Sequence, residues 1–273
     1  MTNFYEDLQV CISTMNSTYD DFKDLIKKIP NILIINQCPN QLDGSIKKKY
    51  FDNGIWIDYD EIGLSKSRNL ALKEATSKYI YLTDDDIDIS DNFYNHLQEI
   101  LTKNDYDFYA FIVEGKNRKF KNDKPYSYEI NKLDSIKFSS VQLIFKRKFL
   151  IDNSIFFDEN FGTGAFYRMG EENILLIDVL KKGAKGKYFP IKIANVYLGE
   201  SSWFKGFNQK YFFDRGATYF RMFGYNSYLL CVLFCISKRN KYKDNISIIS
   251  AISSSFQGIQ YFRKTISQNN QFD

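Results

Sequence analysis

Four carboxylates gather in the short stretch "YIYLTDDDIDIS" (residues 79–90). Asp84, Asp85, Asp86 and Asp88 follow an apolar run that is typical of a buried β-strand. Adjacent carboxylates repel one another, so a fold gains little by collecting them unless they hold a cation. Mg²⁺ and Mn²⁺ take carboxylate oxygens as ligands and commonly draw further ligands from phosphate. We therefore predict that Asp84 and Asp86 bind a divalent metal, Mn²⁺ or Mg²⁺.

The same acids allow other interpretations. Their alternate spacing resembles a calcium loop, but that loop requires Gly at its sixth position and Glu at its twelfth, where this chain has Ile89 and Asn95. A metal-dependent phosphatase with Asp84 as its nucleophile remains open. So does a solvated turn that caps the following helix, which is the preferred interpretation for Asp88 and Asp91.

A second candidate site lies in "GLSKSRNLALKEA" (residues 63–75), which predicts a helix. Arg68 shares one stripe of that helix with apolar residues, namely Leu64, Ala71, Leu72 and Ala75. A lone cation of this kind could simply extend its head group to solvent. Beside an acidic strand end it indicates anion binding, because Arg forms bidentate contacts with phosphate.

A third candidate site is the pair of acids in "FGTGAFYRMGEENILLIDVLKKG" (residues 161–183). Glu171 and Glu172 open a predicted helix that ends at a glycine cap, Gly183. Acids in a first helical turn are favoured by the helix dipole, by ~0.3–1 kcal/mol. The functional alternative is a base that takes a proton from an acceptor hydroxyl. The glycines before the helix predict a mobile loop that faces the acceptor.

The elements that position these residues alternate between strand and helix over the first hundred residues. This pattern predicts a parallel α/β sheet with helices packed on it. After Asp107 strand-like runs dominate and predict a mixed or antiparallel half, followed by the helix at residue 171 and a further strand. The run "SIKKKYF" (residues 45–51) is interpreted as a solvated loop.

Composition restricts the functional class of the 273-residue chain. A net charge of +4 without a basic stripe argues against nucleic-acid binding, and four cysteines with one histidine give no zinc pattern and indicate a reducing compartment. The N-terminus lacks signal-peptide character. From residue 201 the chain becomes aromatic, basic and helical. Such helices either lie in a membrane interface or pack on the rest of the protein, and both interpretations stay open.

Four motifs in order resemble family-2 glycosyltransferases of the GT-A fold, over roughly residues 8–200. The motifs are "STMN" (residues 13–16), the helix start with Gly63, Ser65, Arg68 and Asn69, the acids Asp84 to Asp86, and Gly170-Glu171-Glu172. The resemblance implies a GT-A-like mixed central sheet flanked by helices as residues 1–200, with a helical extension as residues 201–273. It also implies an inverting transfer from a nucleotide sugar, with UDP as the favoured nucleotide, and a divalent metal.

The resemblance assigns roles to individual residues. Asp84 and Asp86 would hold the metal, Glu172 would be the catalytic base, and Glu171 would position the acceptor. The nucleotide-sugar site would comprise Thr14, Asn16, Asn36, Arg68, Asp84 and Asp85. The acceptor would be a saccharide or lipid-linked saccharide of capsule, exopolysaccharide or O-antigen assembly, and the enzyme would be cytoplasmic, with peripheral contact at the inner face of the membrane.

Two departures from the family pattern bear on these expectations. The family carries an Asp after the second strand, where this chain reads "INQC" with Asn36 and Gln37. Many relatives carry a His on a late strand, and "VYLGESSWF" (residues 196–204) has none. A degenerate, non-catalytic GT-A domain that binds saccharide therefore remains a further alternative.

Overall fold

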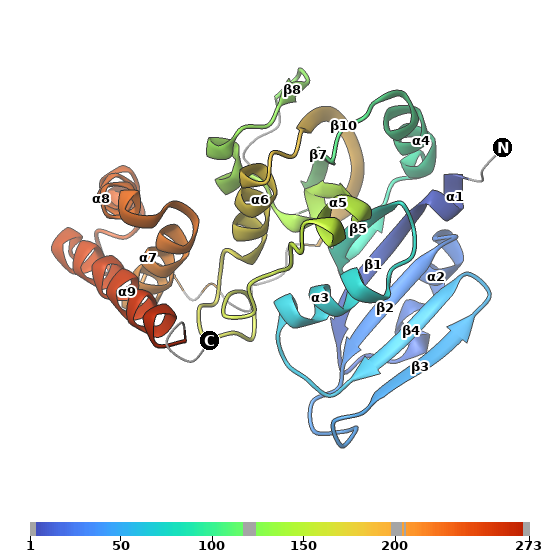
Figure 1. The fold of residues 1–273 in the computed structure, drawn as a ribbon, viewed down its shortest axis with the longest axis horizontal. Helices are drawn as coiled ribbons and strands as arrows, with labels where there is room; N and C mark the ends of the chain where they lie inside the picture. Colours follow the sequence, from blue (N-terminus) through green and yellow to red (C-terminus); the bar gives the residue numbers. More distant parts are fainter. Residues whose placement is uncertain (1–3, 117–123, 198–203, 205, 270–273) are drawn as a thin grey trace.

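The computed structural model describes residues 4–116, 124–197, 204 and 206–269 (Figure 1). The strands are β1 (Leu8–Met15), β2 (Ile32–Gln37), β3 (Ile46–Phe51), β4 (Gly54–Tyr59), β5 (Tyr79–Asp84), β6 (Ile87–Ile89), β7 (Phe108–Gly115), β8 (Tyr128–Glu129), β9 (Leu143–Lys146) and β10 (Gly186–Val196). The α-helices are α1 (Phe4–Asp7), α2 (Lys23–Lys28), α3 (Leu64–Glu74), α4 (Phe93–Lys103), α5 (Arg147–Asp152), α6 (Glu171–Lys181), α7 (Gln209–Phe223), α8 (Ser227–Ser237) and α9 (Ile248–Asn269). Short 3₁₀ helices are η1 (Tyr19–Phe22), η2 (Lys132–Ile136), η3 (Ser140–Gln142), η4 (Gly224–Asn226) and η5 (Arg239–Lys241).

The strands form one mixed sheet in the order β3-β4-β2-β1-β5-β9-β7-β10-β6, with β8 paired to β10. Strands β4, β2, β1 and β5 run parallel to their neighbours within this group, whereas β9 is antiparallel to both β5 and β7. The predicted parallel first half and mixed second half are therefore confirmed. The parallel group matters for the site, because its carboxyl ends meet at one edge of the sheet.

Two apolar cores lie on opposite faces of the sheet. Alternate residues of β1 separate between them: Val10 and Ile12 join the core under α2 and α4, and Cys11 joins the core under α3, α5 and α6. The predicted glycine cap of α6 is also confirmed, since Gly183 has a φ of +86° just beyond the last helical residues. Helices α3 and α6, which carry candidate residues, therefore pack on the same face of the sheet.

Strand β3 corrects one prediction. The run "SIKKKYF" was interpreted as a loop, but its residues pair antiparallel with β4 along the sheet edge. Every position from Ile46 to Tyr50 is exposed, so the run has no buried alternation from which a strand could be recognised. Lysines along an exposed edge discourage pairing with another chain.

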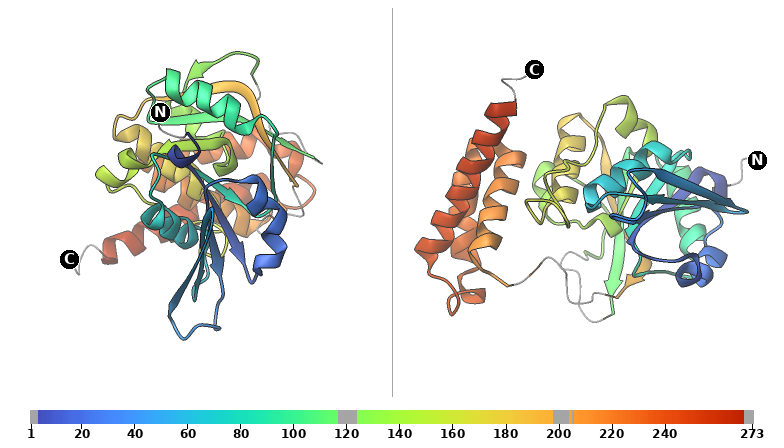
Figure 2. Two further views of the ribbon diagram at one scale, coloured as in Figure 1. Left: turned by 90° about the vertical axis from the view of Figure 1, so that its right-hand side faces the viewer. Right: turned by 90° about the horizontal axis from the view of Figure 1, so that it is seen from below.

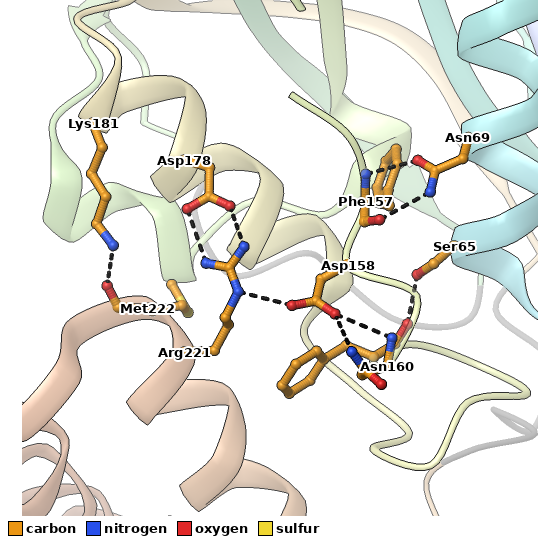
Figure 3. Close-up of polar contacts among 10 residues, drawn as sticks. Ser65, Asn69, Phe157, Asp158, Asn160, Asp178, Lys181, Arg221 and Met222 are labelled. Carbon is orange, nitrogen blue, oxygen red and sulfur yellow. Dashed lines mark hydrogen bonds and ion pairs between the residues drawn. The ribbon is translucent and has the colours of Figure 1, made fainter. Parts of the chain in front are cut away.

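Helices α7, α8 and α9 form a separate layer beside α6 (Figure 2). Helices α7 and α9 approach very closely, since a Cβ at Gly216 would lie 1.9 Å from the carbonyl oxygen of Ser255. Arg221 of α7 joins this layer to the sheet domain, donating to Asp178 at 2.7 and 3.1 Å and to Asp158 at 2.8 Å (Figure 3). The predicted boundary at residues 200 and 201 lies outside the described residues.

Candidate active site

The carboxyl ends of the parallel strands bring several of the predicted residues to one edge. In the register of the sheet, Thr14 pairs with Asn36, Asn36 with Asp58, and Ser13 with Asp84. Side chains at equivalent heights on neighbouring parallel strands lie side by side. The sheet therefore assembles residues that are up to 71 positions apart in sequence, as Ser13 and Asp84 are.

Arg68 is the centre of the site. Its side chain is 2% exposed, and its guanidinium donates to Asp84 Oδ1 at 2.9 Å and to Glu171 Oε1 at 3.2 Å. It also donates to Ser140 Oγ at 2.8 Å and lies over the ring of Phe157. One buried cation thus links the acid that ends β5 to the acid that starts α6. The guanidinium is buried and held by these protein groups, which favours a positioning role for Arg68.

Glu172 has the most unusual electrostatic environment of the site. Burial, the charge of Glu171 and a hydrogen bond with Glu171 raise the pKa of Glu172 to about 8, and the charge of Arg68 only partly opposes this. A carboxyl whose pKa lies near neutrality both accepts and releases protons at working pH. Gly170 allows this helix start, because a Cβ there would lie 2.3 Å from the methyl group of Thr218.

Asp86 is the second acid with a shifted pKa. Burial, then Asp84 and Asp85, raise the pKa of Asp86 to about 6. Within the described ranges, three or more His, Cys, Asp or Glu side chains nowhere gather as a metal cage. The oxygen donors of Asp84 and Asp86 nevertheless fit a hard divalent cation whose remaining ligands come from phosphate and water, since a cation would relieve the repulsion that raises this pKa.

The predicted nucleotide residues divide into two groups. Thr14 donates from its hydroxyl to Asp85 Oδ2 at 2.5 Å, and so joins the acidic cluster directly. Asn16 follows the last residue of β1 and has a φ of +52°, and its side-chain oxygen accepts a hydrogen bond from the Gln41 amide. Asn36 instead lies one strand further out, where its side-chain amide donates to Asp58 Oδ1 at 2.7 Å.

Asp58 is a candidate residue that the sequence analysis missed. It is the penultimate residue of β4 and accepts from the Trp56 indole at 2.6 Å as well as from Asn36. In the family pattern a carboxylate follows the second strand. In this chain Asn36 occupies that region, and its amide donates to a carboxylate on the neighbouring strand, that of Asp58. The detectable signal was an acid at the end of the strand-like run "GIWID".

The remaining motif residues of α3 hold the loop before α6. Asn69 exchanges hydrogen bonds with the backbone of Phe157, donating at 2.9 Å and accepting at 2.8 Å, and Ser65 donates to the Phe161 carbonyl at 2.5 Å (Figure 3). Gly162 and Gly164 permit this approach, because Cβ atoms there would lie 3.1 Å from Ser65 and 2.9 Å from Ile62. The loop was predicted to be mobile, and the structure shows it tied to α3 at several points.

Arg215 of α7 is a second residue that the sequence analysis did not single out. Its guanidinium donates to the Tyr211 hydroxyl at 2.8 Å and lies over the rings of Tyr211, Tyr219 and Phe234. Burial lowers its pKa, but the surrounding tyrosines and Glu172 outweigh this effect and raise it. The C-terminal helices therefore contribute positive charge to the surroundings of Glu172. The late-strand segment at residues 198–203, where a family histidine would stand, lies outside the described residues.

Comparisons with known proteins identify the family and the fold of the chain. Residues 5–169, more than half of the chain, match Glycosyl transferase family 2. The chain therefore belongs to glycosyl transferase family 2, and the predicted GT-A fold is confirmed. No curated protein matches the sequence.

Solved structures show the same fold at low identity. The crystal structure of S. aureus TarS 1–349 in complex with UDP-GlcNAc is 15% identical, with a TM-score of 0.66, and the match covers 93% of this chain and 81% of that chain. The UDP complex of the same fragment gives 14% and 0.63 over the same shares. A further crystal structure of S. aureus TarS 1–349 is 14% identical, with a TM-score of 0.61, and the match covers 98% of this chain and 92% of that chain.

Proposed function

We propose that the protein is an inverting glycosyltransferase that moves a sugar from a UDP-sugar to a hydroxyl of a saccharide or lipid-linked saccharide. The raised pKa of Glu172, beside an acid cluster that suits a diphosphate-bound metal, is the observation that carries the proposal. The solved relatives named above bind UDP-GlcNAc and UDP, which supports a uridine nucleotide as the donor carrier. Capsule, exopolysaccharide or O-antigen assembly at the cytoplasmic face of the membrane is the proposed setting.

In this reaction Glu172 takes the proton of the acceptor hydroxyl while its oxygen attacks the anomeric carbon. The bond between that carbon and the diphosphate oxygen breaks, and the electron pair leaves with UDP. Attack opposite the leaving group inverts the anomeric configuration. Glu171, fixed by Arg68, orients the acceptor. A divalent cation on Asp84 and Asp86 would supply charge stabilisation for the leaving diphosphate.

The acids have different tasks because their surroundings differ. Glu171 lies against the guanidinium of Arg68, which fixes its carboxylate in place to orient the acceptor. Glu172 forms no ion pair with a cation among the described residues. Burial and the neighbouring charge of Glu171 therefore disfavour its ionised form and raise its pKa. Thr14 holds one oxygen of Asp85, and Arg68 holds one oxygen of Asp84, so Asp84 would meet a cation through its other oxygen, together with Asp86.

A thermal-shift panel tests the donor and the metal together. UDP with Mn²⁺ should raise the melting temperature more than UDP or Mn²⁺ alone, because a ligand that binds only the folded state stabilises it by mass action. Asp86→Ala should abolish the combined effect. Asp88→Ala is the matched control, since Asp88 lies on β6 and pairs with Lys28 and Lys116.

Four results would argue against the proposal. Stabilisation by every nucleotide alike would remove the uridine assignment. An unchanged Mn²⁺ effect in Asp86→Ala would remove the metal site. Tight UDP binding without transfer to any acceptor would favour the non-catalytic alternative, and phosphate release that depends on Asp84 would favour the phosphatase.

A further inference from the structure

The outer face of α8 exposes a continuous apolar stripe. Leu229, Leu233 and Ile236 are 64%, 52% and 56% exposed, and Tyr225, one turn earlier, is 70% exposed. Their spacing of four, four and three residues aligns them along one side. Helix α8 contains no charged residue between Ser227 and Ser237. Isolated exposed apolar residues are ordinary, whereas a contiguous stripe marks a surface that another body covers.

Among the described residues, no other element covers this stripe. Cys231 and Cys235 point inward and are fully buried, on the side where α8 packs against α7 and α9. Figure 1 shows α7 between α8 and α6, with the sheet beyond. The stripe therefore faces away from the catalytic domain.

Cations follow the stripe directly in the chain. Lys238, Arg239, Lys241 and Lys243 lie within six residues of the end of α8, with a single acid, Asp244, after them. Among the ion pairs of the described residues, none involves Lys238, Lys241 or Lys243. A surface that covers the stripe would thus be apolar inside and negatively charged at its rim. Those are the properties of an anionic lipid bilayer.

We propose that α8 docks the protein on an anionic membrane, with the stripe in the acyl boundary and residues 238–243 among the headgroups. The helix lies in the plane of the membrane. Tyr225 suits the opposite end, because its ring is apolar and its hydroxyl polar.

A membrane-spanning arrangement does not fit the same segment. Residues Gln209–Ser237 are long and apolar enough to cross a membrane by length and composition. However, Gly224, with φ 58° and ψ −136°, ends α7, and Arg221 binds α7 to the catalytic domain. The 11 residues of α8 alone extend about 16 Å, against a hydrocarbon thickness of about 30 Å. Peripheral docking is the geometry that remains.

Vesicle flotation of the full chain tests the proposal. The protein should float with vesicles of phosphatidylglycerol and phosphatidylcholine, and at least about tenfold less with phosphatidylcholine alone. The proposal gains its biological meaning from the lipid-linked acceptor proposed above. Its test needs neither donor nor acceptor, so failure of docking and failure of the proposed activity are separate results.

Two variants and one control locate the surface. The triple variant Leu229→Ser/Leu233→Ser/Ile236→Ser should lose at least about tenfold in flotation. The triple variant Lys238→Gln/Lys241→Gln/Lys243→Gln, which changes one half-buried and two exposed side chains, should lose a similar factor on anionic vesicles. Ile46→Ser/Tyr50→Ser is the control, because β3 combines exposed apolar residues with lysines at the other end of the molecule (Figure 1). Circular dichroism establishes that each variant is folded.

Several outcomes would overturn the inference. They are equal flotation with neutral and anionic vesicles, flotation lost in the β3 control but kept in both α8 variants, and no flotation at all. Light scattering that shows an oligomer in the wild type and a monomer in the Leu229→Ser triple variant would assign the stripe to a second copy of the chain instead.

Discussion

Two arginines organise this molecule, and each joins a pair of acids from different elements. Arg68 connects Asp84 with Glu171 inside the catalytic domain. Arg221 connects Asp158 with Asp178 where α7 meets that domain. The Arg68 side chain is 2% exposed and that of Arg221 is 26% exposed.

The two clusters differ in their balance of charge. Arg221 meets two acids with close, partly bidentate geometry, and the cluster has no further acid with a raised pKa. Around Arg68 three more acids, Asp85, Asp86 and Glu172, stand near the two that it holds, and the pKa values of Asp86 and Glu172 are raised. Both acids of the Arg221 cluster are ion-paired with the arginine, so this cluster serves to join two parts of the fold. In the Arg68 cluster, Asp86 and Glu172 are not ion-paired with the arginine, so their carboxyl groups remain available to hold a cation or to transfer a proton.

The largest difference between the clusters should appear in turnover. Glu172→Gln keeps the size and hydrogen bonding of the side chain but removes the proton acceptor, so turnover should fall by ~10²–10⁴. The melting temperature and UDP affinity should change little. Steady-state kinetics and calorimetry on the same preparations measure both.

Neighbouring substitutions sharpen this result. Glu171→Gln should mainly raise the Michaelis constant of the acceptor, as expected when binding is lost uniformly. Asp178→Asn, in the Arg221 cluster, should lower the melting temperature and leave turnover near normal. An active Glu172→Gln beside an inactive Glu171→Gln would exchange the roles of the two acids.

Stability should separate the two arginines next. Arg68→Ala leaves Glu171 buried without a counter-charge and should lower the free energy of unfolding by about 3–5 kcal/mol. Arg221→Ala exposes its acids to nearby solvent and should cost about 1–3 kcal/mol. Urea titration of both variants measures the difference. Equal losses would show that burial does not distinguish the clusters.

The smallest effect should be a dependence on pH at the acid cluster. The pKa of Asp86 in the fold, about 6, exceeds its ordinary value of 3.8, so the folded state binds more protons in this interval. Without metal, the contribution of Asp86 to stability is therefore present below about pH 4 and is lost as the pH rises through 6. Mn²⁺ competes with that proton, so its affinity should fall about tenfold between pH 7 and pH 5. Asp86→Asn should remove both dependences, and a pH-independent Mn²⁺ affinity in the wild type would contradict the assignment.

The sequence predicted the fold where burial is periodic. Strands β1, β2 and β5 are continuous apolar runs, and α3 and α4 carry apolar residues at helical spacing, so local pattern and final structure agree. Strand β3 was not recognised because its first five residues, Ile46 to Tyr50, are all exposed. Its pairing with β4 is a property of the sheet edge and leaves no mark in its hydrophobic pattern.

Within the site, the predictable part was the set of acids that follow a strand or open a helix. Asp58 was missed because its significance depends on the register that sets it beside Asn36. The partners of Arg68 were likewise hidden, since Glu171 is 103 residues away in the chain. The contact of Arg221 with Asp158 and Asp178 depends on how α7 docks, and no local pattern encodes that.

The long separation between Arg68 and Glu171 has a consequence for synthesis. Helix α3 leaves the ribosome well before α6, and at about 5–20 residues per second the interval between the two residues lasts roughly 5–20 s. During that time Arg68 has Asp84, 16 residues away, as its earlier partner. In the amino-terminal half of the growing chain, Arg68 is therefore only partly neutralised, by Asp84, until α6 packs against it and brings Glu171 into contact. Completion of the site and completion of the chain are coupled, so a chain interrupted before residue 171 is left with an unfinished core and is open to quality control.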